Sequence, residues 1–225
     1  MNWLLLNSGK CDAAFNMALD EALLEAMPRL GKPVLRFYGW TEPAATFGYS
    51  QRCAEVERMT ALRPLVRRPT GGGLVPHDGD WTYTLVFPPS HPWYRLPARQ
   101  SYERVHDWLQ CAFATTGFLT RLAPGPLPGA GQCFAGAEQY DVLRGGTKVA
   151  GAAQRRSRTG LLIQGSVQPP PDAPAKMAWQ HALCDQARIA WGVEWHAFDP
   201  GNDLLERAQH LASRKYSRRE FNERR

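Results

Sequence analysis

The chain has 225 residues, of which 44% are hydrophobic and 21% are charged, and its formal net charge is +6 at pH 7. This length suits one substantial domain with its own core, and the composition is ordinary for a soluble globular protein. No apolar run is long enough to span a bilayer and the opening NWLLLN is too short for a secretory signal, so we expect a cytoplasmic protein.

The first predicted element is an amphipathic helix over residues 11–27, with Asp12 placed to cap its start. Its apolar residues recur at spacings of three and four, which is typical of one buried helix face. The expected buried face consists of Phe15, Leu19, Ala22, Leu23 and Met27, and the expected solvent face of Asp20, Glu21 and Glu25.

Short strands follow, at residues 33–40, 44–50, 64–69 and 81–87. The last of these, WTYTLVF, alternates clearly: Trp81, Tyr83, Leu85 and Phe87 point one way, and Thr82, Thr84 and Val86 the other.

The second half begins with a helix over residues 100–117, ended by Gly117, and a Gly- and Pro-rich loop that ends at Cys133. Residues 140–153 predict a hairpin with a Gly-Gly turn, residues 160–167 a strand, and residues 176–191 and 203–214 two final helices. The elements together predict an α+β fold: a single domain over residues 1–225, with a central, mostly antiparallel or mixed sheet flanked by helices.

The positive charge is concentrated at the end of the chain, in SRKYSRREFNERR. One interpretation is a solvated helical tail, and the other is a surface for acidic partners. No nucleic-acid-binding module is visible, and an acidic carrier protein would suit the charge equally well.

The five cysteines are Cys11, Cys53, Cys111, Cys133 and Cys184. Their number is odd and none stands in a CxxC pair, so we expect neither a disulfide framework nor a metal site. We interpret all except Cys133 as structural thiols.

The most informative segment is VRRPTGGGLVPHDGDWTYTLVF, residues 66–87. Consecutive glycines let backbone N–H groups approach a ligand, and such groups form an anion-binding surface. With Arg67 and Arg68 beside them, the segment is suited to gripping a carbonyl, carboxylate or phosphate next to an extended apolar tail.

The segments NMALDEALL, RRPTGGGLVPHDGDWTYTL and GTKVAGAAQRR together resemble the lipoate–protein ligase and octanoyltransferase family, relatives of biotin protein ligase. The resemblance runs from Trp3 to about Val167, and it implies that family's catalytic-domain fold, a tunnel for a medium-length acyl chain, and transfer of that chain to a lysine of a lipoyl domain.

The resemblance also implies residue roles. Lys148 matches the family lysine that contacts the acyl carbonyl or acyl phosphate, where an ammonium stabilises the forming oxyanion. His77 is a candidate proton relay for the attacking lysine or, equally, a loop anchor. The implied substrate-binding positions are Arg68, Thr70, Gly71, Gly72, Gly73, Gly151, Ala153 and Gln154.

The segment QCFAGAEQYDV resembles the version of the family that uses a cysteine thioester, and it makes Cys133 the candidate nucleophile. We therefore expect an octanoyltransferase that takes its acyl group from acyl carrier protein, with no cofactor. Its acceptor would be a lipoyl domain or a glycine cleavage H-type protein, and neither nucleic acid nor membrane is an expected partner.

Two alternatives stay open: a lipoate ligase that uses ATP and magnesium, and a non-catalytic binder of a lipoyl domain or acyl chain. Ligases that work alone usually carry an additional domain, for which 225 residues leave no room. Two departures from the family pattern leave the acyl donor open: Ile163-Gln164 stands where a histidine is frequent, and Asp80 where a small residue is frequent.

Overall fold

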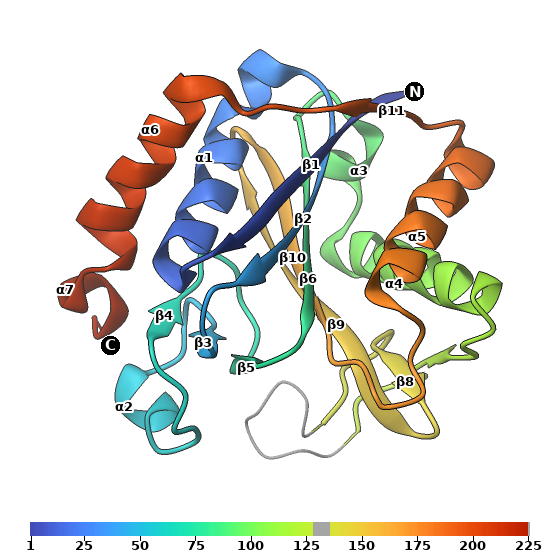
Figure 1. Ribbon diagram of the computed structural model, residues 1–225, viewed down its shortest axis with the longest axis horizontal. Coiled ribbons are helices and arrows are strands. Elements are labelled where there is room, and N and C mark those ends of the chain that lie inside the picture. Colours follow the sequence, from blue (N-terminus) through green and yellow to red (C-terminus); the bar gives the residue numbers. More distant parts are fainter. Residues whose placement is uncertain (128–135, 225) are drawn as a thin grey trace.

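The computed structural model describes residues 1–127 and 136–224, and over these residues the fold is built around an eight-stranded sheet (Figure 1). Its strands β1 and β2 are parallel, as are β1 and β11, and every other neighbouring pair is antiparallel. The order across the sheet is β11 (Glu194–Ala197), β1 (Asn2–Cys11), β2 (Val34–Trp40), β6 (Trp81–Phe87), β10 (Gly160–Val167), β9 (Thr147–Ser157), β8 (Val142–Arg144) and β7 (Arg121–Leu122). The prediction of a mixed sheet is confirmed.

A second, three-stranded sheet lies beside the first, in the order β4 (Leu65–Arg67), β3 (Ala44–Phe47) and β5 (Val75–His77). It has a small core of its own that includes Phe47, Val56 of the short helix α2 (Cys53–Val56) and Leu74. The sequence predicts β3 and β4 but not their separation from the central sheet. It misses β5, whose three residues include Pro76.

Helices cover both faces of the central sheet (Figure 1). The helices α1 (Ala13–Leu30) and α6 (Gly201–Leu211) pack together on one face, and α4 (Ala98–Thr115) and α5 (Lys176–Trp191) pack together on the other. The short helix α3 (Pro92–Arg95) precedes α4. Because both faces are covered, every residue of β6 is buried, and its alternation separates two cores rather than a core from solvent. Among the described residues, no helix is both long and apolar enough to cross a membrane.

Helix α1 begins as predicted, because the Asp12 carboxylate accepts a hydrogen bond from the backbone N–H of Phe15 at 2.8 Å. The expected exposure of Asp20 is wrong, since this side chain is fully buried and forms an ion pair of 2.6 Å with Arg36 on β2. A buried carboxylate needs such a partner, and the helical pattern alone does not reveal a cation on a strand.

The predicted hairpin is confirmed, with β8 and β9 joined through Gly145 and Gly146. Both glycines have positive φ, 55° and 88°, which is the backbone that a tight two-residue turn between antiparallel strands requires.

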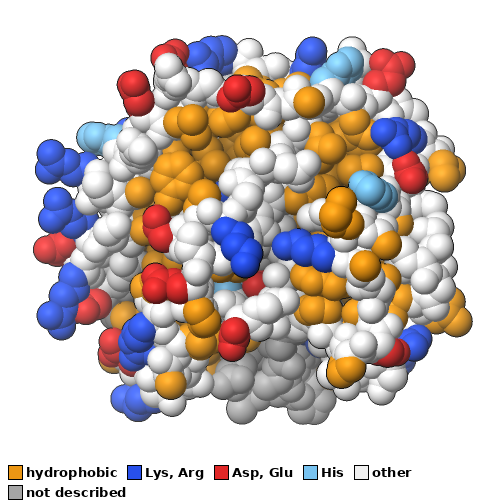
Figure 2. Space-filling view, in the orientation of Figure 1, with side chains coloured by type: hydrophobic (Ala, Val, Ile, Leu, Met, Phe, Trp, Pro, Cys, Tyr) orange, Lys and Arg blue, Asp and Glu red, His pale blue; other side chains and the backbone are white. Residues whose placement is uncertain are grey.

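The end of the chain is not a solvated tail. After α6 it continues as a π-helix (Ala212–Tyr216) and a short helix, α7 (Arg219–Asn222), and it buries Tyr216 and Phe221. The fully buried guanidinium of Arg67 donates to the carbonyl oxygens of Phe221 and Asn222 at 3.2 and 2.8 Å. Arg67 thus anchors the C-terminus instead of offering charge to a ligand, while exposed basic side chains gather along the edge over α6 and α7 (Figure 2).

Candidate functional site

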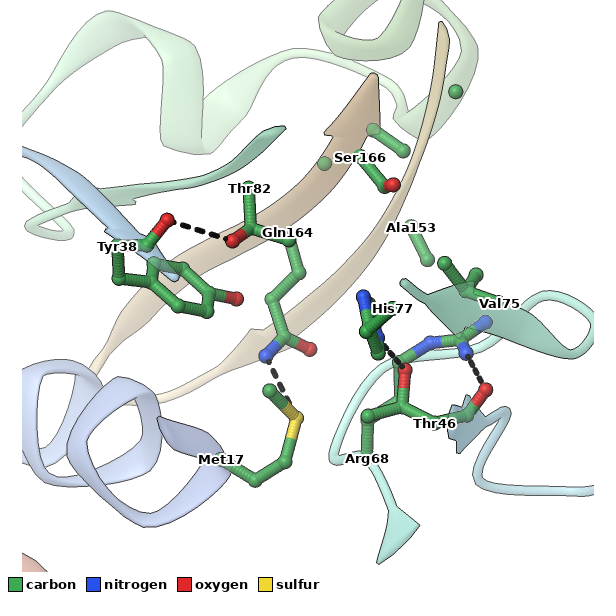
Figure 3. A pocket seen from close by; sticks show the side chains of 13 residues that line it. Met17, Tyr38, Thr46, Arg68, Val75, His77, Thr82, Ala153, Gln164 and Ser166 are labelled. Atoms are coloured by element: carbon green, nitrogen blue, oxygen red, sulfur yellow. Dashed lines mark hydrogen bonds between the residues drawn. The ribbon is translucent and has the colours of Figure 1, made fainter. Parts of the chain in front are cut away.

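A cavity lies between the central sheet and the small sheet, close to the start of α1 (Figure 3). Its empty volume is about 410 Å³, with the open mouth included. Small residues on β9 and β10 leave the space open, and polar side chains surround it. The lining consists of Met17, Tyr38, Thr46, Arg68, Val75, His77, Thr82, Gly151, Ala152, Ala153, Gln164, Gly165 and Ser166.

The glycine triplet is held beside this cavity by Arg68. The guanidinium donates to the carbonyl oxygens of Gly71 and Gly73 at 3.0 and 2.7 Å, and to that of Thr46 at 3.2 Å. The sequence suggests that Arg68 adds positive charge for a ligand, whereas in the structure the same group also fixes the shape of the loop. Gly72 has φ of 81°, a backbone that side chains with a Cβ rarely adopt.

The loop also depends on Gly48, which the sequence does not single out. A Cβ added at Gly48 would lie 1.9 Å from the carbonyl oxygen of Gly72 and 2.9 Å from its carbonyl carbon. Both are backbone atoms, so the loop itself would have to move.

We therefore expect Gly48→Ala to destabilise the protein by about 1–3 kcal/mol, the usual cost of forcing a methyl group into a packed site. The matched control is Gly71→Ala, because a Cβ there meets no atom within 4 Å. Its free energy of unfolding should stay within about 0.5 kcal/mol of the wild type. Urea unfolding of the two variants measures the difference, and equal stabilities would show that the loop yields freely at Gly48.

Lys148 is buried, and its ammonium lies beside Gly151, one of the residues that line the cavity. Its ammonium pairs with Asp141 at 2.7 Å, and these two side chains are 4% and 0% exposed. Asp141 also accepts from the Tyr102 hydroxyl and, at 2.6 Å, from the backbone N–H of Glu138. A Cβ at Gly151, a lining residue, would lie 2.8 Å from Nζ of Lys148, so the absence of a side chain at 151 makes room for the ammonium.

The glycine triplet and the Lys148 ammonium both lie next to residues of strand β9 that line the cavity. A Cβ at Gly72 would lie 3.6 Å from Cβ of Ala153, and Ala153 follows Gly151 by two residues on β9. Two residues of a strand span about 7 Å and bring side chains to the same face. The glycine loop and Lys148 therefore lie near the same face of β9.

His77 is engaged through both ring nitrogens. Its Nδ1 lies 2.8 Å from Oδ2 of Asp80. Its Nε2 lies 2.8 Å from the hydroxyl of Thr46, a contact that Figure 3 shows. Asp80, which departs from the family pattern, is thus the partner of this histidine. The roles of Thr46, Asp80 and Asp141 are not evident from the sequence, because each contact depends on how strand β3 and the two loops that carry Asp80 and Asp141 come together in the fold.

Of the remaining predicted positions, the structure brings some to the cavity and not others. Thr70 donates from its hydroxyl to Gln164 at 2.8 Å and so ties the loop to the cavity wall. Gln154 is not brought to the cavity, since its side-chain amide donates to the carbonyl of Ala98 and its oxygen accepts from Ser101, both on α4. Cys133 lies outside the described residues.

The other four cysteines are free thiols, and burial raises the pKa of each. The effect is largest for Cys184, whose pKa is raised to about 12. Because the thiolate is the reactive form, Cys11, Cys53, Cys111 and Cys184 are poor nucleophiles at neutral pH.

Residues 12–187 match the model of the lipoyl protein ligase A/B catalytic domain. Octanoyltransferase LipM of Kyrpidia tusciae is 37% identical over 179 residues, which cover 73% of this chain and 65% of that protein. Octanoyltransferase LipM of Staphylococcus aureus is 34% identical over 180 residues, with the same coverage. The chain thus spans just under two thirds of the length of these relatives.

Solved structures share the fold at lower sequence identity. Protein Ta0514 of T. acidophilum with bound lipoic acid superposes with a TM-score of 0.82, at 20% identity and over 100% of both chains. Lipoate-protein ligase A bound with ATP gives a TM-score of 0.79, at 20% identity and over 99% of both chains. The resemblance found in the sequence motifs is confirmed.

Proposed function

This chain belongs to the lipoyl protein ligase A/B catalytic domain family, and on that basis we propose that it transfers an octanoyl or lipoyl group to a lysine of a lipoyl-domain protein. The observation that carries the proposal is the buried ammonium of Lys148, fixed by Asp141 against Gly151 in the wall of the cavity. The acyl chain would occupy the cavity, with its carbonyl directed to this ammonium.

In the proposed reaction Lys148 stabilises the negative charge that develops on the carbonyl oxygen during attack. A preorganised cation in a site that excludes water does this effectively, because it needs no reorganisation as the charge forms. Asp141 and Tyr102 hold the ammonium in place. The loop of Gly71, Gly72 and Gly73, shaped by Arg68 and tied down by Thr70, would close one side of the site.

We propose Cys133 as the nucleophile, on the strength of its sequence context. A thiolate accepts an acyl group from a thioester and passes it on to an amine, so the donor would be octanoyl acyl carrier protein. The relatives named octanoyltransferase support octanoyl as the transferred group, and the raised pKa values of Cys11, Cys53, Cys111 and Cys184 argue against these four as carriers.

The acceptor would be a lipoyl domain or a glycine cleavage H-type protein, and neither nucleic acid nor membrane enters the scheme. We also propose a cytoplasmic location, which suits the free thiols among the described residues.

Incubation with octanoyl acyl carrier protein should add the mass of one octanoyl group to the chain, and Cys133→Ser should remove the adduct. Intact-protein mass spectrometry measures both, and Cys111→Ser, at an exposed thiol, is the matched control that should keep the adduct. Undiminished transfer by Cys133→Ser would reject the thioester step.

The two alternatives predict different outcomes, each with its own measurement. A ligase would exchange pyrophosphate into ATP when lipoate is present, and it would stay active without Cys133. A non-catalytic binder would bind the lipoyl domain and give no lipoylated product from either donor.

A further inference from the structure

We propose that Thr46, His77 and Asp80 form a proton relay that opens into the cavity at the Thr46 hydroxyl and accepts the proton of the attacking lysine amine. This inference rests on the proposed acyl transfer. It assigns a catalytic role to Thr46, and positioning roles to His77 and Asp80.

The three side chains form a continuous hydrogen-bonded line across the small sheet. Thr46 lies on β3 and His77 on β5, and Oγ1 of Thr46 is 2.8 Å from Nε2 of His77. Nδ1 of His77 is 2.8 Å from Oδ2 of Asp80, and this oxygen also accepts from the Ser166 hydroxyl at 2.7 Å. This is the order of groups, hydroxyl, imidazole and carboxylate, that activates hydroxyls in hydrolases.

The direction of the relay follows from the chemistry of these groups. An ionised carboxylate only accepts hydrogen bonds, so Nδ1 of His77 carries a proton and donates it to Asp80. In the neutral ring Nε2 is then the acceptor, and the Thr46 hydroxyl donates to it. Since both nitrogens are engaged within the protein, the imidazole reaches a substrate only through Thr46, whose oxygen keeps a lone pair to accept a proton.

The relay is largely buried, although His77 and Asp80 also line a second, more open pocket together with Trp40 and Lys176. Thr46, His77 and Asp80 are all buried, and the indole ring of Trp40 stacks on the imidazole with 3.7 Å between ring centroids and 20° between planes. Oδ1 of Asp80 has no hydrogen-bond partner among the described residues. The buried carboxylate holds the imidazole in this orientation and tautomer.

The relay and Lys148 face the same reacting group. Ser166, which bonds to Asp80, is the cross-strand partner of Gly151, and directly opposed residues on antiparallel strands lie about 5 Å apart. The Gly151 position is in turn next to Nζ of Lys148. A carbonyl at that ammonium would have the relay on the neighbouring strand.

The step balances as follows. The lone pair of the acceptor amine forms the new C–N bond at the acyl carbonyl carbon, and the nitrogen gives a proton to Oγ1 of Thr46 while the hydroxyl proton moves to Nε2 of His77. The C–S bond of the thioester breaks, and the electron pair leaves with sulfur. The thiolate then takes the proton back from the imidazolium by the same path, and the relay is restored.

The test separates the two half-reactions. In the first, acyl transfer from one sulfur to another involves no N–H proton, whereas in the second the amine must lose one. Octanoyl enzyme is prepared with octanoyl acyl carrier protein, freed of donor and mixed with a lipoyl domain in single turnover. We expect Thr46→Val to slow this second step by about 10²–10⁴-fold, the range for loss of a general base, and to slow it far more than the first step. Thr46→Ser keeps the hydroxyl and should restore most of the rate.

Equal slowing of both half-reactions by Thr46→Val, or no rescue by Thr46→Ser, would reduce the three residues to a structural anchor. If Thr46→Val does not fold, Asp80→Asn decides by the same comparison, with the selective loss expected and a wild-type second step refuting the relay. A wild-type enzyme that takes up no octanoyl group at all would reject the proposed function, and the relay with it.

Discussion

Lys148→Met is expected to lower the rate of acyl transfer by about 10²–10³-fold, the range for removal of one preorganised oxyanion donor. Methionine keeps the unbranched side chain as far as Cε but supplies no charge to the carbonyl oxygen. The effect should appear mainly in kcat, because the stabilised charge exists only in the transition state. Single-turnover transfer of octanoyl to a lipoyl domain, followed by mass spectrometry, measures it.

The same substitution leaves the Asp141 carboxylate buried without its cation. Breaking a buried ion pair in this way costs about 3–5 kcal/mol of stability, so lost activity could reflect unfolding. The double variant Lys148→Met/Asp141→Asn removes the charge on both sides and should recover much of the stability. Its transfer rate should stay low, and a double variant as active as the wild type would exclude Lys148 from the chemistry.

Local signals predicted the parts of the fold in which neighbours in sequence decide the structure. The cap at Asp12, the Gly145-Gly146 turn and the bounds of α5 all follow from residues within a few positions of one another. Strand β1 was missed although it lies in the sheet, because its partners β2 and β11 are parallel to it and far away in sequence. No local pattern encodes such a pairing.

In the candidate site, too, local motifs were predictable and contacts between distant residues were not. Motifs identified His77, Lys148 and the glycine loop, and the structure brings these to one cavity or its edge. What they bond to was not predictable, because Thr46 is 31 residues from His77, and Asp141, which is near Lys148 in sequence, is on the other side of the hairpin turn. Gln154 was misplaced because its side chain turns to α4, where it bonds to Ala98 and Ser101, and the motif does not show that this helix packs there.

Asp20 illustrates why charge is a poor guide to exposure in this chain. Its carboxylate accepts from Arg36 at 2.6 Å, and from Thr84 and Gln164 at 2.7 Å each. Gln164 in turn accepts from Thr70 in the glycine loop. A buried charge on α1 is therefore linked, through Gln164 and Thr70, to the position of the glycine loop beside the cavity.

Arg36→Met is accordingly expected to cost about 3–5 kcal/mol of stability, because it leaves the Asp20 carboxylate buried and unpaired. Asp20→Asn in the same chain removes that charge, and the double variant should unfold at a higher urea concentration than Arg36→Met alone. The surface control is Arg207→Met, which breaks the ion pair with Glu25. The side chain of Arg207 is 46% exposed and that of Glu25 is 40% exposed, so this variant should cost no more than about 1 kcal/mol. Equal losses for the buried and the surface pair would show that Asp20 is hydrated in solution. In that case Gln164 would lose its fixed partner, and the hydrogen bonds from α1 could not be what holds the glycine loop.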